Sequence, residues 1–219
     1  MTIIEARVLA MKLYDYTLAP NPRRVRIFLA EKGIAVPTVP VDLRAGEQFT
    51  PEFRRINPEC TVPVLEFDDG KRIAEVVAIC TYFEIVHPAP PLMGAGAEDQ
   101  AIVTAWQHRV ERQGMWAAAD AFRNSAPGLQ GRALAGPDDY AQIPALAERG
   151  RTRVMRFFEM LDGELAGREF IAGERYTIAD ITALVTVDFA ARIKLAIPED
   201  GVHLRRWHRE VSARPSAAA

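Results

Sequence analysis

The sequence predicts an α+β fold in which a β-α-β-α-β-β-α domain comes first and an all-helical domain follows. Strand-like and helix-like apolar patterns alternate over roughly the first ninety residues. A Pro-rich stretch, "PAPPLMGAG", then interrupts the chain, and beyond it the apolar residues recur at helical spacing. We therefore place one domain at residues 11–88 and the other at residues 97–215.

The first elements follow from local signals. Residues 11–16 form an apolar run that predicts a strand. The helix after the turn "LAPNP" ends at Gly33, because glycine suits the left-handed position at a helix end. Residues 36–43 predict a second strand. It should lie at the edge of the sheet, since Pro37 and Pro40 cannot donate to a neighbour.

The rest of this domain contains a short helix, a hairpin and a longer helix. Thr50 and Pro51 are typical of a helix start, and Pro58 ends that helix within two turns. The Asp-Gly of "DDG" predicts a tight turn between strands at residues 64–67 and 71–74. From Glu75 the helical apolar face contains Val76, Ile79, Cys80, Phe83 and Val86.

Three helices are clear in the second half. Ile102, Trp106 and Val110 recur every four residues, so we expect Trp106 in the core. A second apolar face runs from residue 154 to residue 165. "TIAD" at residues 177–180 has the layout of a capping box, which is structural and carries no chemistry.

Composition excludes several classes of protein. The 219 residues include 27 Lys and Arg against 29 Asp and Glu, without a basic stripe that would indicate a nucleic-acid partner. No apolar run approaches the roughly 20 residues of a membrane span. The first ten residues lack the features of a secretory signal and read as a short leader. With two cysteines, Cys60 and Cys80, and no disulfide framework, we expect a cytoplasmic protein.

Three motifs, in order along this layout, resemble the cytosolic glutathione transferase family, in particular its bacterial, theta-like members. They are "LAPNPRRVRIFLAEKGI", "INPECTVPVLE" and "YTIADI", and the resemblance spans about residues 11 to 215. It implies a thioredoxin-like N-terminal domain, an all-α C-terminal domain, and glutathione as a co-substrate with no metal. It also implies a homodimer.

The resemblance further implies a glutathione site in the first domain. Pro63 would follow a cis peptide bond, so that Val62 pairs its backbone with the tripeptide much as an added strand would. Glu75 would take the γ-glutamyl ammonium at the start of a helix whose N-terminus favours the carboxylate. Val76 replaces the usual serine, and its backbone N–H remains as a donor. Gln48 would contact the glycyl end.

Thiol activation is where the sequence departs from the family. Ala19 stands at the position of the catalytic serine, and alanine offers no donor to a thiolate. Asn21 and Thr17 are the nearest candidates, and we favour Asn21, at the mouth of the helix. A free thiol has a pKa near 8.5, and lowering it by about two units requires roughly 2.7 kcal/mol of thiolate stabilisation.

A small hydrophobic electrophile would bind between the two domains, against the first long helix of the second. Met115 and Trp116 are the candidates for that pocket. Two alternatives stay open. Because Ala19 and Val76 occupy polar positions of the family, the chain could bind glutathione or an apolar ligand without turnover. Cys60 could instead form a mixed disulfide with glutathione and act in disulfide reduction.

Overall fold

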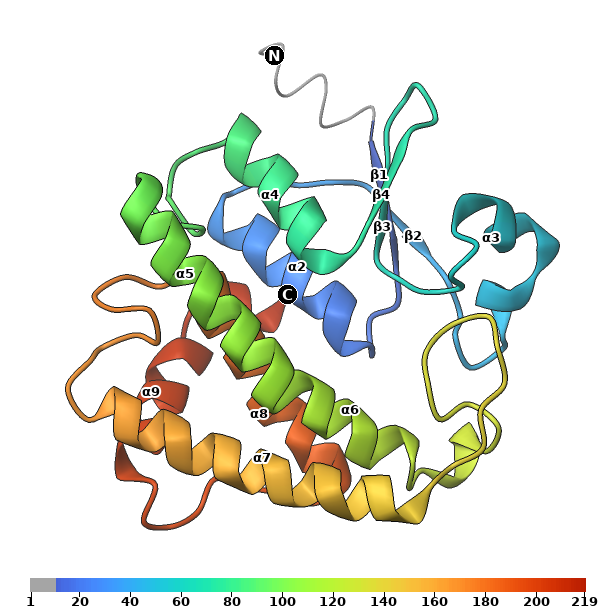
Figure 1. Cartoon of the computed structure of the whole chain (residues 1–219). Helices are drawn as coiled ribbons and strands as arrows, with labels where there is room; N and C mark the ends of the chain where they lie inside the picture. Colours follow the sequence, from blue (N-terminus) through green and yellow to red (C-terminus); the bar gives the residue numbers. More distant parts are fainter. Residues whose placement is uncertain (1–10) are drawn as a thin grey trace. The chain divides into compact units, whose positions relative to one another are not determined.

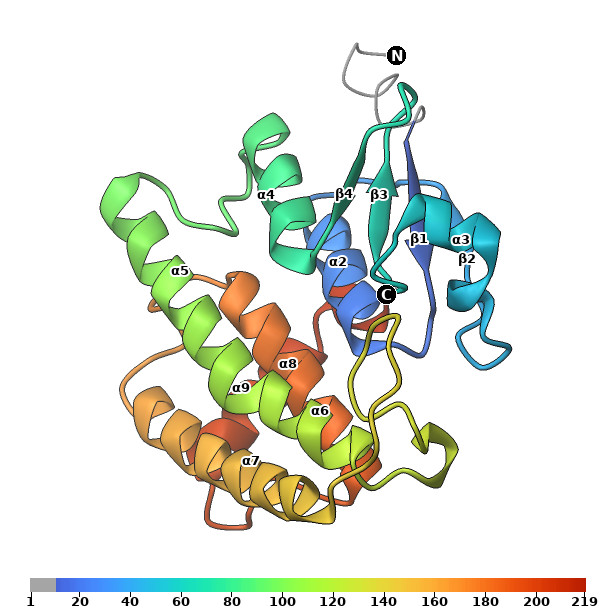
Figure 2. The same cartoon turned by 45° about the vertical axis from the view of Figure 1, so that its right-hand side comes forward.

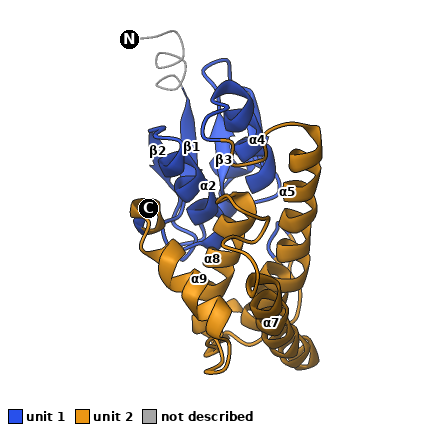
Figure 3. Cartoon of the chain, turned by 90° about the vertical axis from the view of Figure 1, so that its left-hand side faces the viewer, with its two compact units in different colours: residues 1–90, 135–137, 218–219 blue, residues 91–134, 138–217 orange. Residues whose placement is uncertain are grey.

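The computed structural model describes residues 11–219, so the expected leader lies outside the described residues. Two compact units are present (Figure 3). Unit 1 contains the chain up to Pro90 together with residues 135–137 and 218–219, and unit 2 contains residues 91–134 and 138–217. None of the helices within residues 11–219 is long and apolar enough to cross a membrane.

Unit 1 is built on a mixed sheet. Its strands, within the described residues, lie in the order β2-β1-β3-β4. β2 is parallel to β1, whereas β3 is antiparallel to both of its neighbours. β2 is an edge strand, as predicted from its prolines. The bounds are β1 (Lys12–Asp15), β2 (Thr38–Pro40), β3 (Val64–Glu66) and β4 (Arg72–Ala74).

Helices cover both faces of this sheet (Figures 1 and 2). α2 (Pro20–Glu31) and α4 (Val76–Val86) lie against one face, and α3 (Pro51–Ile56) lies against the other. Tyr14 in β1 packs edge-on against Phe53 in α3, with ring centroids 6.0 Å apart. Thr50 caps α3 as predicted, accepting a hydrogen bond from the Phe53 N–H at 3.2 Å. Gly33 has the predicted left-handed conformation, with φ of 65°.

Unit 2 is mostly helical, with α8 at its centre. Nearly every side chain of α8 is buried, as expected for a helix surrounded by others. The predicted apolar face of α7 is buried throughout. The helices are α5 (Ala97–Val110), a π-helical turn (Glu111–Met115), α6 (Trp116–Arg123), α7 (Pro144–Leu165), α8 (Ile178–Ala190) and α9 (Val202–Ser212). Short 3₁₀ turns lie at Glu47–Phe49, Pro127–Leu129, Ala191–Ile193 and Pro215–Ala218.

The prediction for the buried face of α5 was wrong for Ile102 and Trp106 and is confirmed for Val110, which is fully buried. Ile102 is 43% exposed, and Trp106 is only half-buried. Trp106 is flanked by Arg109 and Arg168, whose guanidinium carbons lie 4.6 and 5.2 Å from its ring centroid. An aromatic ring that attracts cations over its face can remain at the surface. The residues that α5 does bury are Val103, Gln107 and Val110.

The buried face was missed because one of its members is polar. Gln107 is 2% exposed, and its Oε1 accepts a hydrogen bond of 2.9 Å from the hydroxyl of Thr182 in α8. This bond satisfies the oxygen of the buried amide, whereas its Nε2 has no hydrogen-bond partner within residues 11–219. Apolar spacing alone could not reveal this pair.

The second half is also less helical than its pattern predicted. Residues 124–143 contain only a 3₁₀ turn and an isolated bridge. Gln142 joins the end of this stretch to its start, because its amide donates to the carbonyls of Arg123 and Ala126 at 2.7 and 2.8 Å. Several Gly and Pro residues in "SAPGLQGRALAGPDDYAQIP" are the signal that should have indicated a loop.

The predicted capping box is present, and its acid does more than cap a helix. Asp180 is fully buried. Its carboxylate accepts hydrogen bonds from the N–H and hydroxyl of Thr177, the N–H of Ile171 and the indole N–H of Trp207, at 2.9 to 3.1 Å. Burial raises the pKa of Asp180 to about 6, and the four donors act in the opposite direction. This carboxylate thus joins α8, α9 and the loop before α8.

α6 and α7 approach each other closely because of one glycine. A Cβ atom at Gly150 would lie 2.7 Å from the carbonyl oxygen of Ala117 and 2.7 Å from the nitrogen of Ala121. Both are backbone atoms of helices, which cannot move aside independently. Gly163, in the same α7, has no atom within 4 Å of the corresponding position.

We therefore expect opposite effects from two identical substitutions. Gly150→Ala should lower the free energy of unfolding by about 1 to 3 kcal/mol, because it forces the two helices apart. Gly163→Ala should raise it by up to about 1 kcal/mol, since alanine favours a helix interior over glycine. Urea unfolding followed by circular dichroism measures both. Shifts of the same sign would contradict this account of the α6/α7 contact.

Candidate functional site

The register of the sheet brings the ends of three strands, β1, β3 and β4, together at one end of the sheet, which we call the site edge of unit 1. Tyr14 lies opposite Val64, which lies opposite Ala74. β1 therefore leaves the sheet where β3 enters it and where β4 leaves it. α2 and α4 begin just after these ends (Figure 2), so two helix N-termini, with their partial positive charge, belong to the same edge.

The entry to β3 offers an unpaired piece of backbone. The peptide bond between Val62 and Pro63 is cis, as the resemblance implied. The side chain of Val62 is buried, but neither its N–H nor its C=O has a hydrogen-bond partner among the described residues. Free backbone groups beside a sheet can pair with an extended peptide.

The preceding loop is shaped by Asn57, which sequence reasoning did not single out. Asn57 is 5% exposed, and its amide donates to the carbonyl and the hydroxyl oxygen of Thr61 at 2.9 and 3.0 Å. Its own Oδ1 accepts from the N–H of Glu59 at 3.1 Å. The loop therefore folds around one side chain and delivers the chain to Val62.

The exit from β4 has an unusual backbone. Glu75 has φ of 71°, a region that non-glycine residues seldom occupy and that is often found at binding sites. Glu75 is exposed and is the N-cap of α4, although its side chain makes no capping bond. Val76 follows with its side chain 4% exposed, so only its backbone N–H can serve a ligand there.

The start of α2 orients the amide of Asn21. The N-cap is Ala19, which provides no side-chain bond, and Asn21 lies exposed in the first turn. Arg24 donates to Asn21 Oδ1 at 3.2 Å. A guanidinium can only donate, so the oxygen of the amide must face Arg24 and its NH₂ group points elsewhere. Asn21 thereby keeps a donor for a ligand.

Thr17, the other candidate for thiol activation, is also exposed. Its carbonyl oxygen accepts a hydrogen bond of 3.0 Å from Arg26, which forms an ion pair of 2.6 Å with Asp15. Arg26 thus joins the loop between β1 and α2 to the end of β1. Arg24 and Arg26 were missed. The spacing of Arg24 from Asn21 on a predicted helix was a usable signal, whereas Arg26 pairs with Asp15 of a strand, which local spacing does not indicate.

The remaining predicted residues are more scattered. Gln48 lies in the 3₁₀ turn after β2, and its Oε1 is buried without a hydrogen-bond partner in the described part of the chain. Met115 and Trp116 belong to unit 2, where Met115 is buried and Trp116 is 58% exposed. Cys60 is 4% exposed, and its thiol donates to the carbonyl of Pro58 at 3.4 Å.

The site carries no metal centre within residues 11–219, where no group of three or more His, Cys, Asp or Glu could hold an ion. What this end of the sheet offers is a set of donors and one exposed carboxylate, since that of Asp15 is buried and paired with Arg26. The donors are backbone N–H groups and the amide of Asn21, and the carboxylate is that of Glu75.

Comparison with known proteins identifies the family. Residues 19–85 match the model for the glutathione S-transferase N-terminal domain, and residues 131–215 match the model for its C-terminal domain. A glutathione S-transferase domain-containing protein from Marinobacter aquaeolei has a similar structure, with a TM-score of 0.86 and 41% identity, covering 94% of this chain and 98% of that one. The structure of Gtt2 from Saccharomyces cerevisiae gives a TM-score of 0.87 at 34% identity, with the same coverage.

Sequence similarity extends over nearly the whole chain. Glutathione S-transferase 2 of Saccharomyces cerevisiae is 35% identical over 209 residues, which are 94% of this chain and 87% of that protein. Two family domains in the expected order, and full-length relatives at this identity, support one assignment. The chain belongs to the glutathione S-transferase family.

Proposed function

We propose that this protein conjugates the thiolate of glutathione to a small hydrophobic electrophile. The observation that carries the proposal is the unpaired backbone of Val62, at an edge of the sheet where α2 and α4 both begin. A peptide that pairs with Val62 extends toward these two helix N-termini. Its thiol and its terminal carboxylate can then both lie near partial positive charge.

Each end of glutathione has a matching group. Glu75 is exposed and can accept the γ-glutamyl ammonium, while the N–H of Val76 donates to the neighbouring carboxylate. Gln48 is the proposed contact for the glycyl end, where its side-chain NH₂ group can donate to the carboxylate. Glutathione acts here as co-substrate, and the proposed chemistry uses no metal.

The thiolate is stabilised by Asn21 in this proposal. The hydrogen bond from Arg24 leaves the NH₂ group of Asn21 free to donate. A hydrogen bond to a charged group contributes about 1.5 to 3 kcal/mol, most of what a shift of about two pKa units requires. Thr17 is the alternative donor.

The second substrate and the assembly are also proposals. Trp116 is an exposed aromatic surface that suits a hydrophobic electrophile, whereas its apolar neighbour Met115 is buried and could contact one only if its flexible side chain moved. A homodimer is the usual assembly of the family, and Ile85 on α4, 74% exposed, is an apolar group that an interface could cover. Two free, buried cysteines fit a cytoplasmic location.

One alternative function has a specific observation in its favour. Because the N-cap of α2 is Ala19, no hydroxyl stands where the family's catalytic serine would be, and a protein that binds glutathione without turnover remains the second candidate. Disulfide reduction through Cys60 has less support, since its thiol is buried and already donates to a backbone carbonyl.

Three assays on the wild-type protein separate these functions. We expect conjugation of glutathione to an activated aryl chloride, calorimetric binding of glutathione, and no reduction of a mixed disulfide. Binding without conjugation would favour the carrier. Disulfide reduction that is lost in Cys60→Ser would favour the reductase and contradict the proposal.

The thiolate donor is tested by Asn21→Ala beside Thr17→Ala, two exposed positions where alanine should leave the fold intact. Asn21→Ala should raise the pKa of the thiol of bound glutathione by about one to two units, and it should lower turnover at pH 7 about tenfold or more. The ultraviolet absorbance of the thiolate reports the pKa directly. Thr17→Ala should change neither quantity, and the reverse result would assign the role to Thr17.

The ammonium contact is tested by Glu75→Gln, which removes the charge and keeps the shape. Glutathione should bind about tenfold more weakly, because a charge-assisted contact becomes neutral. Asp68→Asn, at an exposed position in the β3/β4 turn, is the matched control and should bind normally. Equal affinities for both variants in calorimetry would remove Glu75 from the site.

A further inference from the structure

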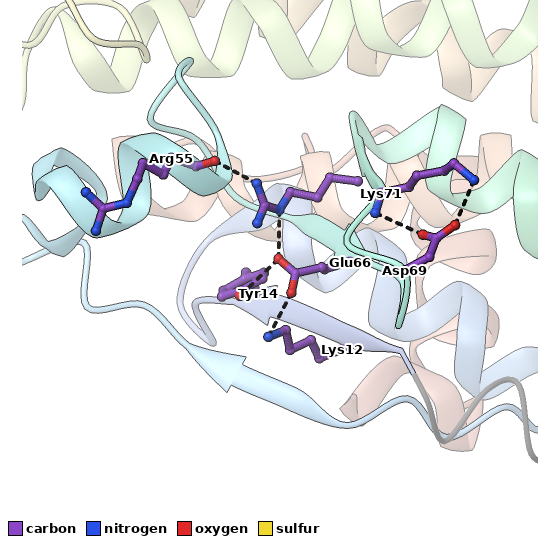
Figure 4. A network of polar contacts seen from close by, with 7 residues as sticks. Lys12, Tyr14, Arg55, Glu66, Asp69 and Lys71 are labelled. Carbon is purple, nitrogen blue, oxygen red and sulfur yellow. Dashed lines mark hydrogen bonds and ion pairs between the residues drawn. The ribbon is translucent and has the colours of Figure 1, made fainter.

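A row of alternating charge crosses three strands of unit 1. Lys12 in β1 lies opposite Glu66 in β3, which lies opposite Arg72 in β4. Lys12 forms an ion pair of 2.8 Å with one oxygen of Glu66, and Arg72 Nε forms one of 2.7 Å with the other. Tyr14 also donates to Glu66, at 3.4 Å, and Figure 4 shows Lys12 and Tyr14 pointing toward the carboxylate.

Glu66 remains charged in this setting. Its side chain is only 12% exposed, and burial by itself would favour the neutral acid. Hydrogen bonds from Lys12 and Arg72 outweigh that effect, so the pKa of Glu66 lies below its ordinary value. The same contact raises the pKa of Lys12. The row is therefore ionised throughout the neutral range.

A second nitrogen of the Arg72 guanidinium makes a contact outside the sheet. Its Nη1 donates to the carbonyl oxygen of Arg55 at 2.6 Å. Arg55 lies in the last turn of α3, where backbone carbonyls have no partner within the helix. A cation is also favoured at that end of a helix. One guanidinium thus joins β3, β4 and the C-terminal turn of α3, and we name Glu66, Arg72 and this carbonyl the Arg72 clamp.

Through α3 the clamp is connected to the backbone of Val62, which we call the Val62 arm of the proposed site. Two residues after Arg55, Asn57 begins the loop that its own side chain closes onto Thr61. Val62 is the next residue. A shift of the last turn of α3 would be passed along this hydrogen-bonded loop to the backbone that is to pair with glutathione.

Through β4 the clamp is connected to Glu75, which we call the Glu75 arm of the proposed site. Glu75 follows Arg72 by three residues, and only Ile73 and Ala74 lie between them. The strand is short and, within residues 11–219, lies at the edge of the sheet with one neighbouring strand to hold it. The salt bridge to Glu66 adds a second restraint just before the backbone turns to positive φ.

We propose that Arg72 is a positioning residue, which keeps the Val62 arm and the Glu75 arm at the separation that glutathione requires. This inference rests on the proposed function. Arg72 does not touch the ligand. It acts because its planar fork can serve a carboxylate and a carbonyl at once, which the single ammonium of lysine does less well.

The first test compares Arg72→Met with Lys71→Met. Lys71 pairs with Asp69 at 2.7 Å, but this pair is in the exposed hairpin turn and has no contact with α3 among the interactions described (Figure 4). In Arg72→Met, the dissociation constant and the KM for glutathione should rise about fivefold to tenfold, because binding must then order two arms that the clamp no longer holds in place. The KM for the electrophile and kcat at saturating glutathione should stay within about twofold. Lys71→Met should match the wild type.

Arg72→Lys separates charge from geometry. It can keep the pair with Glu66 but not both contacts together, so it should recover less than half of the lost affinity. If Arg72→Lys had the full wild-type affinity for glutathione, a positive charge at this position would be sufficient, and the clamp would be contradicted. A fall in kcat as large as the rise in KM would also overturn it, since positioning of glutathione alone predicts a change in KM.

A second measurement works without glutathione. Amide hydrogen exchange should speed up at residues 53–62 and 74–76 in Arg72→Met, and remain unchanged elsewhere in unit 1 and in Lys71→Met. Unchanged exchange at those residues, or a uniform increase across the unit, would overturn the clamp. If the wild-type chain does not bind glutathione, the proposed function fails, whereas the exchange result still decides whether Arg72 couples the two arms.

Discussion

The register of β3 against its two neighbours is the constraint on which the proposed site depends. Val64 stands between Tyr14 and Ala74, so the chain enters β3 at the point where it leaves β1 and β4. A slip of one residue would move every side chain of β3 to the opposite face. It would bury Glu66 beneath α2 and α4, and it would separate the backbone of Val62 from Glu75. Position in this site is therefore set by sheet pairing before any ligand arrives.

Much of unit 1 could be predicted, because its elements carry strong local signals. Thr50 caps a helix, Gly33 ends one, and the Asp-Gly turn sets the β3/β4 hairpin. Unit 2 was harder. Its α5 buries Gln107, which bonds to Thr182 of α8, and leaves Trp106 half-exposed between Arg109 of the same helix and Arg168 from beyond α7. The contacts with Thr182 and Arg168 are tertiary, so the spacing of apolar residues does not predict them.

The site divides in the same way. Val62, Pro63 and Glu75 could be named because a family motif marks them, and the cis bond before Pro63 agrees with it. Arg72 could not be named from a motif. Its pairing with Glu66 does follow from the hairpin by counting outward from the turn, but its second contact does not. The carbonyl of Arg55 becomes reachable only when α3 packs on the sheet, which no local pattern describes.

The chemistry of α2 explains how a thiolate could be stabilised without the family's serine. Pro20 and Pro22 have no N–H, and Arg23 donates back to the carbonyl of Ala19, so Asn21 holds the one free N–H of the first turn. Its side-chain amide, turned by Arg24, adds a second donor from the same residue. A helix terminus contributes about 0.3 to 1 kcal/mol and a donor to an anion about 1.5 to 3 kcal/mol. Together these approach the roughly 2.7 kcal/mol that a shift of about two pKa units demands. Replacing serine with alanine at position 19 therefore relocates the donor in this proposal, and the loss of a hydroxyl need not be a loss of activity.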